Sequence, residues 1–124
     1  MRTILVVAFA AVAGLNALSA SAEEAKLKTV AAINQEMTAL SGQQVRLQGK
    51  VVKVNNGIMG RNFLHVQDGT GDPKTNDVTI TSKQTANVGD KVSVTGKVTL
   101  NKDFGSGYAY PLLVEDATIT TVAK

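Results

Sequence analysis

Four aromatic side chains beyond residue 22 are the residues best suited to bind a ligand. Phe104, Tyr108 and Tyr110 share one short stretch with two glycines, and Phe63 lies in a separate segment. Aromatic rings beside cations can stack on bases or on the faces of sugars, while the cations follow phosphate groups. Two interpretations stay open. Either the rings bind a ligand, or Tyr108 and Tyr110 anchor the glycine-rich segment to the rest of the protein.

Basic residues accompany the rings and continue along other segments. Arg61 stands two positions before Phe63, and Lys102 stands two positions before Phe104. Further cations alternate with apolar residues and are expected to face outward, namely Arg46, Lys50, Lys91 and Lys97. They predict either a basic stripe, whose charge nearby aspartates reduce, or an ordinary solvated surface. The net charge of the chain is +3, so any nucleic-acid binding is expected to be weak and sensitive to salt.

His65 and Met59 could together hold a soft metal ion. His65 is the chain's single histidine, and Met59 stands in the segment just before it. Imidazole and thioether ligands both suit copper. Two ligands are few for a metal site, so a plain surface histidine or a histidine that faces another ligand is the alternative interpretation. No other metal and no cofactor is expected, since the acidic segment 68–72 is interpreted as a tight turn.

The residues needed for several enzyme classes are missing from the sequence. The chain has no cysteine and one histidine, which excludes thiolate nucleophiles, iron–sulfur clusters, cysteine zinc sites and a three-histidine metal centre. Ser106 lies between glycines, but without the spacing of a nucleophile elbow. The sequence therefore predicts a protein that binds rather than one that catalyses.

The first 22 residues have the pattern of a secretory signal peptide. A basic start is followed by an apolar run over residues 4–18 and then by Ala20, Ser21 and Ala22. The run is short for a transmembrane helix, which needs about 20 apolar residues. Cleavage after Ala22 predicts a periplasmic or secreted protein without a stable membrane anchor. Loss of Arg2 with this segment lowers the net charge from +3 to +2.

Residues 23–42 are expected to form an N-terminal segment with one short helix, and residues 43–124 a β domain. One apolar stripe recurs at helical spacing and consists of Val30, Ile33, Met37 and Leu40. Gly42 supplies the signal that ends the helix. We expect the helix to cap the β domain, and a helix that binds a partner is the alternative.

After Gly42 the apolar residues recur with a period of two, which is typical of strands. Five strands are expected, over residues 45–54, 63–68, 78–80, 92–100 and 112–122. Two longer loops join them, over residues 55–62 and 101–111. The first loop contains the pair Asn56 and Gly57, which is suited to a hairpin turn.

A glycine stands inside each of the two longest expected strands. Gly49 lies where the apolar face shifts its phase, and Gly96 lies in the middle of the fourth strand. Such glycines indicate bulges or bends, which long strands need in order to serve both sides of a small barrel. The pattern predicts an all-β protein with little helix, namely a five-stranded OB-fold Greek-key barrel. An open sandwich is the alternative, although it would be expected to have more strands.

Segments of the chain resemble the core pattern of bacterial OB-fold domains, namely those that begin at Val45, Phe63 and Val88. Residues 57–69 and 102–111 are most similar to small exported OB-fold proteins of the NrfJ-related group, and more distantly to periplasmic stress-tolerance OB-fold proteins. The resemblance implies a non-enzymatic binding protein of the cell envelope, possessing an accessory or stress-related role. Some members carry a cysteine-based haem or redox motif, which this cysteine-free chain lacks.

In an OB-fold the ligand meets the outer face of the second and third strands and the loops that flank it. Phe63 and His65 are expected on that outer face, and the other candidates in the two loops. The predicted ligand-binding residues are Met59, Arg61, Phe63, His65, Lys102, Phe104, Tyr108 and Tyr110. The ligand stays open. The alternatives are a single-stranded nucleic acid and, through Met59 and His65, copper.

Overall fold

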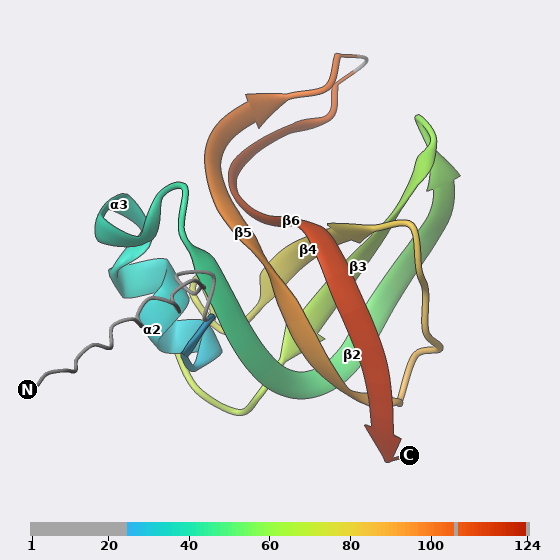
Figure 1. Ribbon diagram of the computed structural model, residues 1–124, viewed down its shortest axis with the longest axis horizontal. Coiled ribbons are helices and arrows are strands. Elements are labelled where there is room, and N and C mark those ends of the chain that lie inside the picture. The colour runs from blue at the N-terminus through green and yellow to red at the C-terminus, as the bar shows by residue number, and fades with distance from the viewer. Residues whose placement is uncertain (1–24, 106, 124) are drawn as a thin grey trace, which may run out of the picture.

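The computed structural model describes residues 25–105 and 107–123, which form a mostly β structure with two short helices (Figure 1). The expected signal peptide, residues 1–22, lies outside the described residues. In chain order the elements are β1 (Lys26–Leu27), α2 (Val30–Gln35), α3 (Met37–Leu40), β2 (Gln44–Ile58), β3 (Arg61–Gln67), β4 (Val78–Ser82), β5 (Lys91–Asp103) and β6 (Ala109–Ala123).

The strands form one mixed sheet whose pairings close into a ring. β2 pairs with β3, β3 with β4, β4 with β6, β6 with β5, and β5 again with β2. The prediction of a β protein with little helix is confirmed. The sheet has six strands rather than the expected five, because Lys26 and Leu27 extend alongside β2 and form the short parallel strand β1.

β2 is long because it serves two neighbours in succession. Residues 44–50 pair with β5, and residues 50–58 pair with β3. Gly49 lies at this change of partner, where an added Cβ would stand 2.6 Å from the carbonyl oxygen of Gln67 and 2.7 Å from Val66 Cγ1. Both distances are too short for a side chain. Gly49 therefore permits the close approach of β3 on which the change of partner depends.

Gly96 permits a similar close approach between the paired strands β5 and β6. A Cβ added there would stand 2.7 Å from Val114 Cγ1 and 2.9 Å from the carbonyl oxygen of Glu115. The register between β5 and β6 shifts between Thr95 and Lys97, on either side of this glycine. The bulge expected from the sequence lets β5 pair with β2 over its first half and with β6 over most of its length.

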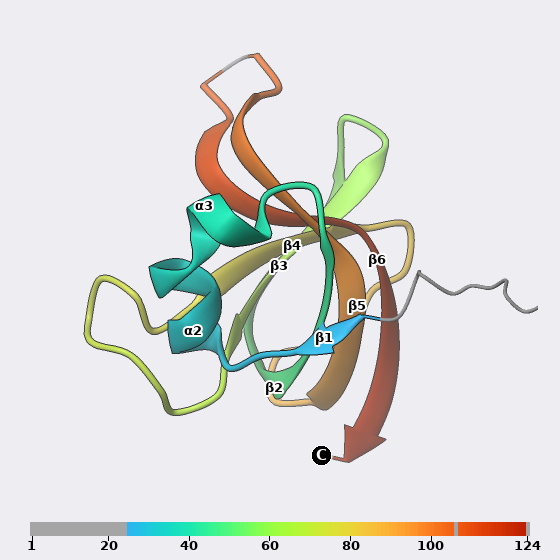
Figure 2. The ribbon, with the colours of Figure 1, turned by 60° about the vertical axis from the view of Figure 1, so that its left-hand side comes forward.

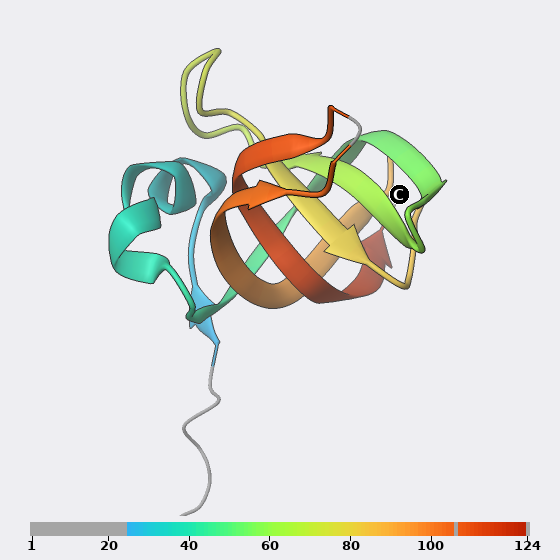
Figure 3. The ribbon, with the colours of Figure 1, turned by 90° about the horizontal axis from the view of Figure 1, so that it is seen from above.

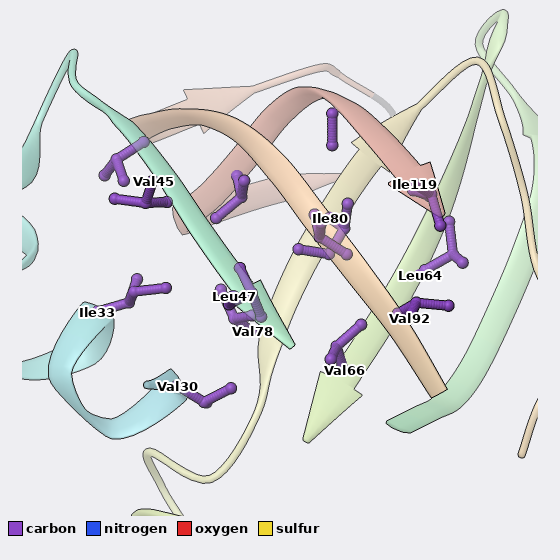
Figure 4. Packing of buried hydrophobic residues seen from close by; sticks show 14 of the residues in the cluster. Val30, Ile33, Val45, Leu47, Leu64, Val66, Val78, Ile80, Val92 and Ile119 are labelled. Atoms are coloured by element: carbon purple, nitrogen blue, oxygen red, sulfur yellow. The ribbon is translucent and has the colours of Figure 1, made fainter. Parts of the chain in front are cut away.

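The inward side chains of the ring and one face of the helices form a single aliphatic core. Figure 4 shows Leu47, Val78 and Ile80 inside the ring, with Val30 and Ile33 directed at it from α2. Each of these side chains is at most 2% exposed. Burial of one such side chain contributes about 1.5–3 kcal/mol to folding. The described members of this buried cluster are all aliphatic, which leaves the aromatic rings for another part of the molecule.

The predicted helical stripe is confirmed, but the helix is divided in two. Three residues of the stripe are buried, and Met37 packs against them. Glu36 has φ −105° and ψ 16°, so α2 ends there and α3 begins after it. Thr29 caps α2, because its hydroxyl oxygen accepts a hydrogen bond from the N–H of Ala32. Both short helices cover one end of the ring (Figure 2).

The acidic segment after β3 fixes the start of α2. The Asp68 carboxylate accepts hydrogen bonds from the Val30 N–H at 2.9 Å and the Thr70 N–H at 3.0 Å, and Thr70 Oγ1 accepts one from the Ala31 N–H. Burial raises the pKa of the Asp68 carboxyl, but the Thr70 hydroxyl and the two N–H donors outweigh it and hold the pKa below its ordinary value of 3.8. Both carboxylate oxygens are therefore engaged inside the protein.

The first hairpin is tighter than the sequence predicts. The expected loop over residues 55–62 is wrong, because β2 and β3 extend through most of it. The turn consists of Met59 and Gly60, whose φ values of 52° and 81° are both positive, as a type I′ turn requires. Asn56 and Gly57 instead lie in β2, where its register with β3 shifts. The glycine signal there marks a bulge rather than a turn.

Candidate functional site

The ends of two hairpins lie side by side at one end of the ring (Figures 1 and 3). The β2–β3 hairpin turns at Met59 and Gly60, and the β5–β6 hairpin turns between Asp103 and Ala109. The second loop is shorter than the expected 101–111, because Lys102 and Tyr110 pair directly in the ladder. The predicted site residues that meet between these hairpins are Arg61, Phe63, Lys102, Phe104, Tyr108 and Tyr110.

Phe63 is the centre of an aromatic cluster that joins the two hairpins. Its ring centroid lies 5.4 Å from that of Phe104, 6.2 Å from that of Tyr108 and 5.6 Å from that of Tyr110. The rings of Phe63 and Phe104 meet edge to face at 79°, an arrangement that aromatic pairs favour. These four rings, called the aromatic cluster below, hold the β5–β6 hairpin against β3.

The aromatic cluster has a buried base, which is Phe63, and a partly exposed rim, which consists of the other three rings. Phe63 is 1% exposed and Tyr108 is 36% exposed, while Phe104 and Tyr110 are half-buried. The expectation that Phe63 lies on an open outer face is therefore corrected. Its ring is outside the aliphatic core, but the other three rings cover it. The three covering rings form the part of the cluster that a ligand can reach, and they also anchor their loop.

Two cations share one ring and one carboxylate at the edge of the cluster. Arg61 Cζ lies 4.9 Å from the centroid of the Phe104 ring, and Lys102 Nζ lies 5.5 Å from it. Glu115 Oε2 lies 3.8 Å from Arg61 Nη1 and 3.9 Å from Lys102 Nζ. One carboxylate is therefore shared by two cations at this edge of the cluster.

Glu115 is a site residue that the sequence reasoning missed. Leu112 and Val114 belong to the aliphatic core, so the alternation of β6 directs Leu113 and Glu115 to the outer face. That alternation is visible in the sequence. What the sequence does not reveal is that the outer face of β6 at Glu115 meets Arg61 of the other hairpin, since this depends on how the ring closes.

Met59 and His65 lie outside the aromatic cluster and apart from each other. Met59 is 42% exposed in the turn, whereas His65 Nδ1 lies 3.2 Å from Asp77 Oδ2. A strand rises about 3.3 Å per residue, so His65 stands roughly 13 Å along β3 from Arg61, where the strand begins. This spacing disfavours one copper ion held by both side chains. Within residues 25–105 and 107–123, no three His, Cys, Asp or Glu side chains gather as a metal site.

A cleft of about 330 Å³ adjoins the aromatic cluster along the β5–β6 hairpin. Its lining residues are Asn101, Lys102, Asp103, Ala109, Tyr110 and Pro111. Lys102 and Tyr110 belong to both the cleft and the edge of the cluster, so the two features form one continuous candidate site. The volume lies at the lower end of the range that small-molecule sites occupy, about 300–1,000 Å³.

No protein-family model matches this chain, and no curated protein matches it. Solved structures do share its fold. The crystal structure of a putative aspartyl-tRNA synthetase from Leishmania major Friedlin aligns with 90% of this chain, at a TM-score of 0.59 and 13% sequence identity. The chain spans 23% of the length of that protein.

Two OBody proteins, each bound to hen egg-white lysozyme, are similar over nearly their whole length. OBody AM2EP06 has a TM-score of 0.59 and OBody AM1L10 one of 0.56, and each is 16% identical to this chain over 84% of it. The alignments cover 99% and 100% of the two OBody chains. Identities at this level show a similar fold.

Among the described residues, no helix is long and apolar enough to cross a membrane.

Proposed function

We propose that this chain is a non-enzymatic, exported binding protein built on an OB-fold barrel, with its ligand site at the aromatic cluster. The observation that carries the proposal is the convergence of two hairpins on one patch. The reachable rings of Phe104, Tyr108 and Tyr110 come from one hairpin, and Arg61 beside them comes from the other. The fold brings Arg61 to the rings of the other hairpin, although they lie far apart in the sequence.

The strand pairings support the OB-fold assignment. Five strands pair in a ring, and β2 is shared between β3 and β5. Two structures named OBody align with the chain along nearly their whole length. Ligands of OB-folds meet the second and third strands and the flanking loops. In this chain that region corresponds to β3, β4 and the two hairpin ends.

The site suits a ligand that combines a ring with an anionic group. The rim of the aromatic cluster offers faces and edges on which a base or a sugar can stack. Glu115 lies between Arg61 and Lys102, and Asp103 lines the adjoining cleft, so an anionic group would contact the two cations at the edge of the cluster rather than the cleft. A neutral glycan would use the rings alone, whereas an oligonucleotide would use both the rings and the charge.

We assign the site to binding rather than to catalysis. His65 carries the one imidazole of the chain, and it pairs with Asp77 outside the aromatic cluster, so the four rings and the cations beside them include no imidazole base. Export is proposed from the signal-peptide pattern of residues 1–22. An accessory role in the cell envelope or in stress tolerance is proposed from the resemblance of residues 57–69 and 102–111 to exported bacterial OB-fold proteins.

The test is fluorine NMR of the chain labelled with 3-fluorotyrosine. The chain has two tyrosines, and both belong to the aromatic cluster, so both resonances report on the site. An oligothymidylate or a chitin oligosaccharide that binds is expected to shift both resonances in a saturable manner. Tyr108→Phe assigns the two signals.

The control is Val88→Ala, which changes an exposed side chain in the turn before β5 and should keep the response. A probe that binds by calorimetry and leaves both tyrosine resonances unmoved would contradict the proposed site.

A further inference from the structure

A second surface, on β1, β2 and β5, carries cations almost without acids. β2 contains three cations and neither Asp nor Glu, and the one acid of β5 is its last residue, Asp103. β1 adds Leu27, which pairs with the outward Arg46 of β2, whereas Lys26 pairs with the buried Val45 and so points to the other side. Figure 2 shows these three strands together. The exposed cations of this surface, called the basic face below, are Arg46, Lys50, Lys91 and Lys97.

The basic face is a ladder of charges roughly 20 Å long. Lys50 stands directly opposite Lys91 in the pairing of β2 with β5, and Lys97 stands near Arg46 at the other end. Lys91 and Lys97 are six residues apart on one strand that rises about 3.3 Å per residue, which sets this length. The other outward side chains between them are uncharged and polar, namely Gln44, Gln48, Ser93 and Thr95.

Within the part of the chain that the structure describes, no cation of the basic face forms an ion pair. Asp68 shares a cleft of about 260 Å³ with Lys50 and Lys91, but its oxygens accept hydrogen bonds from Val30 and Thr70. Like charges directly opposite in a ladder destabilise a sheet. Two lysines face one carboxylate in this cleft, so a local excess of positive charge remains that an external anion would relieve.

Exposed aliphatic side chains stand beside these cations. Leu27 is 63% exposed on β1, where it is paired with Arg46. Val122 is 55% exposed and lines the same cleft as Lys91, and Val88, three residues before Lys91, is 63% exposed. Exposed aliphatic residues among lysines are typical of surfaces that bind anionic bilayers.

We propose that the basic face docks reversibly on the surface of an anionic lipid bilayer. Its cations attract the headgroups, and Leu27, Val88 and Val122 enter the boundary between headgroups and acyl chains. A single-stranded nucleic acid would also fit the charge, but it gains much of its affinity from stacking on aromatic rings. The aromatic rings in the described residues lie in the aromatic cluster and not on this face, which favours the bilayer.

Partition onto lipid vesicles tests the proposal. The buried core lies between Val30 and Ile119, so a chain that begins at Glu23 keeps the whole core and is used. We expect binding to phosphatidylcholine vesicles with about a third phosphatidylglycerol, and no binding to phosphatidylcholine alone. Binding should be lost near 1 M salt, where the Debye length is about 3 Å. Lys50→Gln with Lys91→Gln should weaken partition roughly 25-fold, at about fivefold for each cation.

The matched control is Lys74→Gln with Lys83→Gln, which removes two exposed lysines outside the basic face and should leave partition unchanged. The Lys50 and Lys91 double variant should unfold at no lower temperature than its parent, because it relieves opposed like charges. That measurement separates loss of binding from loss of fold. Val88→Asn with Val122→Thr should weaken partition without changing its salt dependence.

Three results would overturn the proposal. The first is equal partition of the two lysine double variants. The second is failure to bind anionic vesicles at low salt. The third is tighter binding to an oligothymidylate than to the vesicles, weakened by the changes at Lys50 and Lys91. None of these results depends on the aromatic cluster, so the proposed function is tested separately.

Discussion

Phe63 and Tyr108 belong to the same aromatic cluster but are 1% and 36% exposed, respectively. Phe63 lies beneath three rings and fixes where they stand, so its contribution is to packing. Tyr108 is partly open to solvent, so its contribution to folding is smaller and its contribution to a ligand larger. The two residues therefore separate the stability of the site from its binding.

Phe63→Ala is expected to lower the free energy of unfolding by about 3–5 kcal/mol, as for other buried phenylalanines. Tyr108→Ala should lower it by about 1 kcal/mol or less, since a third of its side chain is already exposed. Urea unfolding of both variants measures the difference. Similar losses for the two would show that the cluster has no buried base distinct from its rim.

Asp68 links α2 to the segment after β3, and this contact should depend on pH. The pKa of Asp68 in the folded protein lies below its ordinary value of 3.8. Its stabilising effect is therefore fully present above about pH 3.8, and it is lost as the pH falls through the folded-state pKa. Asp68→Asn should cost about 1 kcal/mol at neutral pH, as loss of a helix cap does.

Thermal unfolding from neutral to acid pH measures this effect, and Asp68→Asn should flatten the acid limb. Part of the acid sensitivity should persist, because the Lys74 N–H and the Thr75 hydroxyl also hold the pKa of Asp72 below its ordinary value. An acid limb as steep in Asp68→Asn as in the parent chain would contradict the role assigned to Asp68.

At the scale of elements, β2 decides the closure of the ring by leaving β5 and joining β3 at Gly49. An alanine there would place its Cβ 2.6 Å from the carbonyl oxygen of Gln67, a backbone atom that cannot rotate away. Gly49→Ala is expected to lower the free energy of unfolding by about 1–3 kcal/mol, as overpacking does. Chemical denaturation measures the loss.

The control for Gly49→Ala is Gln48→Ala, which changes the exposed neighbour on the same strand and should cost less than about 0.5 kcal/mol. If Gly49→Ala is as stable as Gln48→Ala, the close approach of β3 does not restrict position 49 to glycine.

Local periodicity predicts most of the elements but not their ends. The helical stripe and the alternation of the strands both appear in the structure, since each follows from burying one face. The Asn56 and Gly57 pair was misleading, because a glycine with positive φ serves a bulge as well as a turn. Met59 in the turn gives no such signal in the sequence, since turns with two positive φ values usually employ Asn or Gly.

At the scale of the whole molecule, ring closure decides which residues meet. The sequence identifies the four rings, and both cations beside Phe104, as candidates. It does not reveal that the rim buries Phe63, or that Glu115 of β6 lies between Arg61 and Lys102. Those contacts join segments far apart in the chain, and they depend on the pairing of β4 with β6 and of β5 with β2.

The closed ring gives the chain two separate surfaces of different chemistry. The aromatic cluster and its cleft lie at the hairpin ends, where rings stand beside two cations. The basic face on β1, β2 and β5 combines cations with exposed aliphatic side chains. The ligand site lies at the hairpin ends and the docking surface lies along the first half of β5 and its neighbours, an arrangement that would allow both to be occupied at once.

Mapping amide chemical shifts over the chain is the most direct test of the central claim. An oligothymidylate and a chitin oligosaccharide are each added to the ¹⁵N-labelled protein. We expect the probe that binds to perturb Arg61, Lys102, Phe104, Tyr108 and Tyr110. We further expect Tyr108→Ala to weaken that binding about tenfold, within the 1–3 kcal/mol that stacking on one ring supplies. Saturable perturbations confined to other strands, unchanged by Tyr108→Ala, would contradict the account.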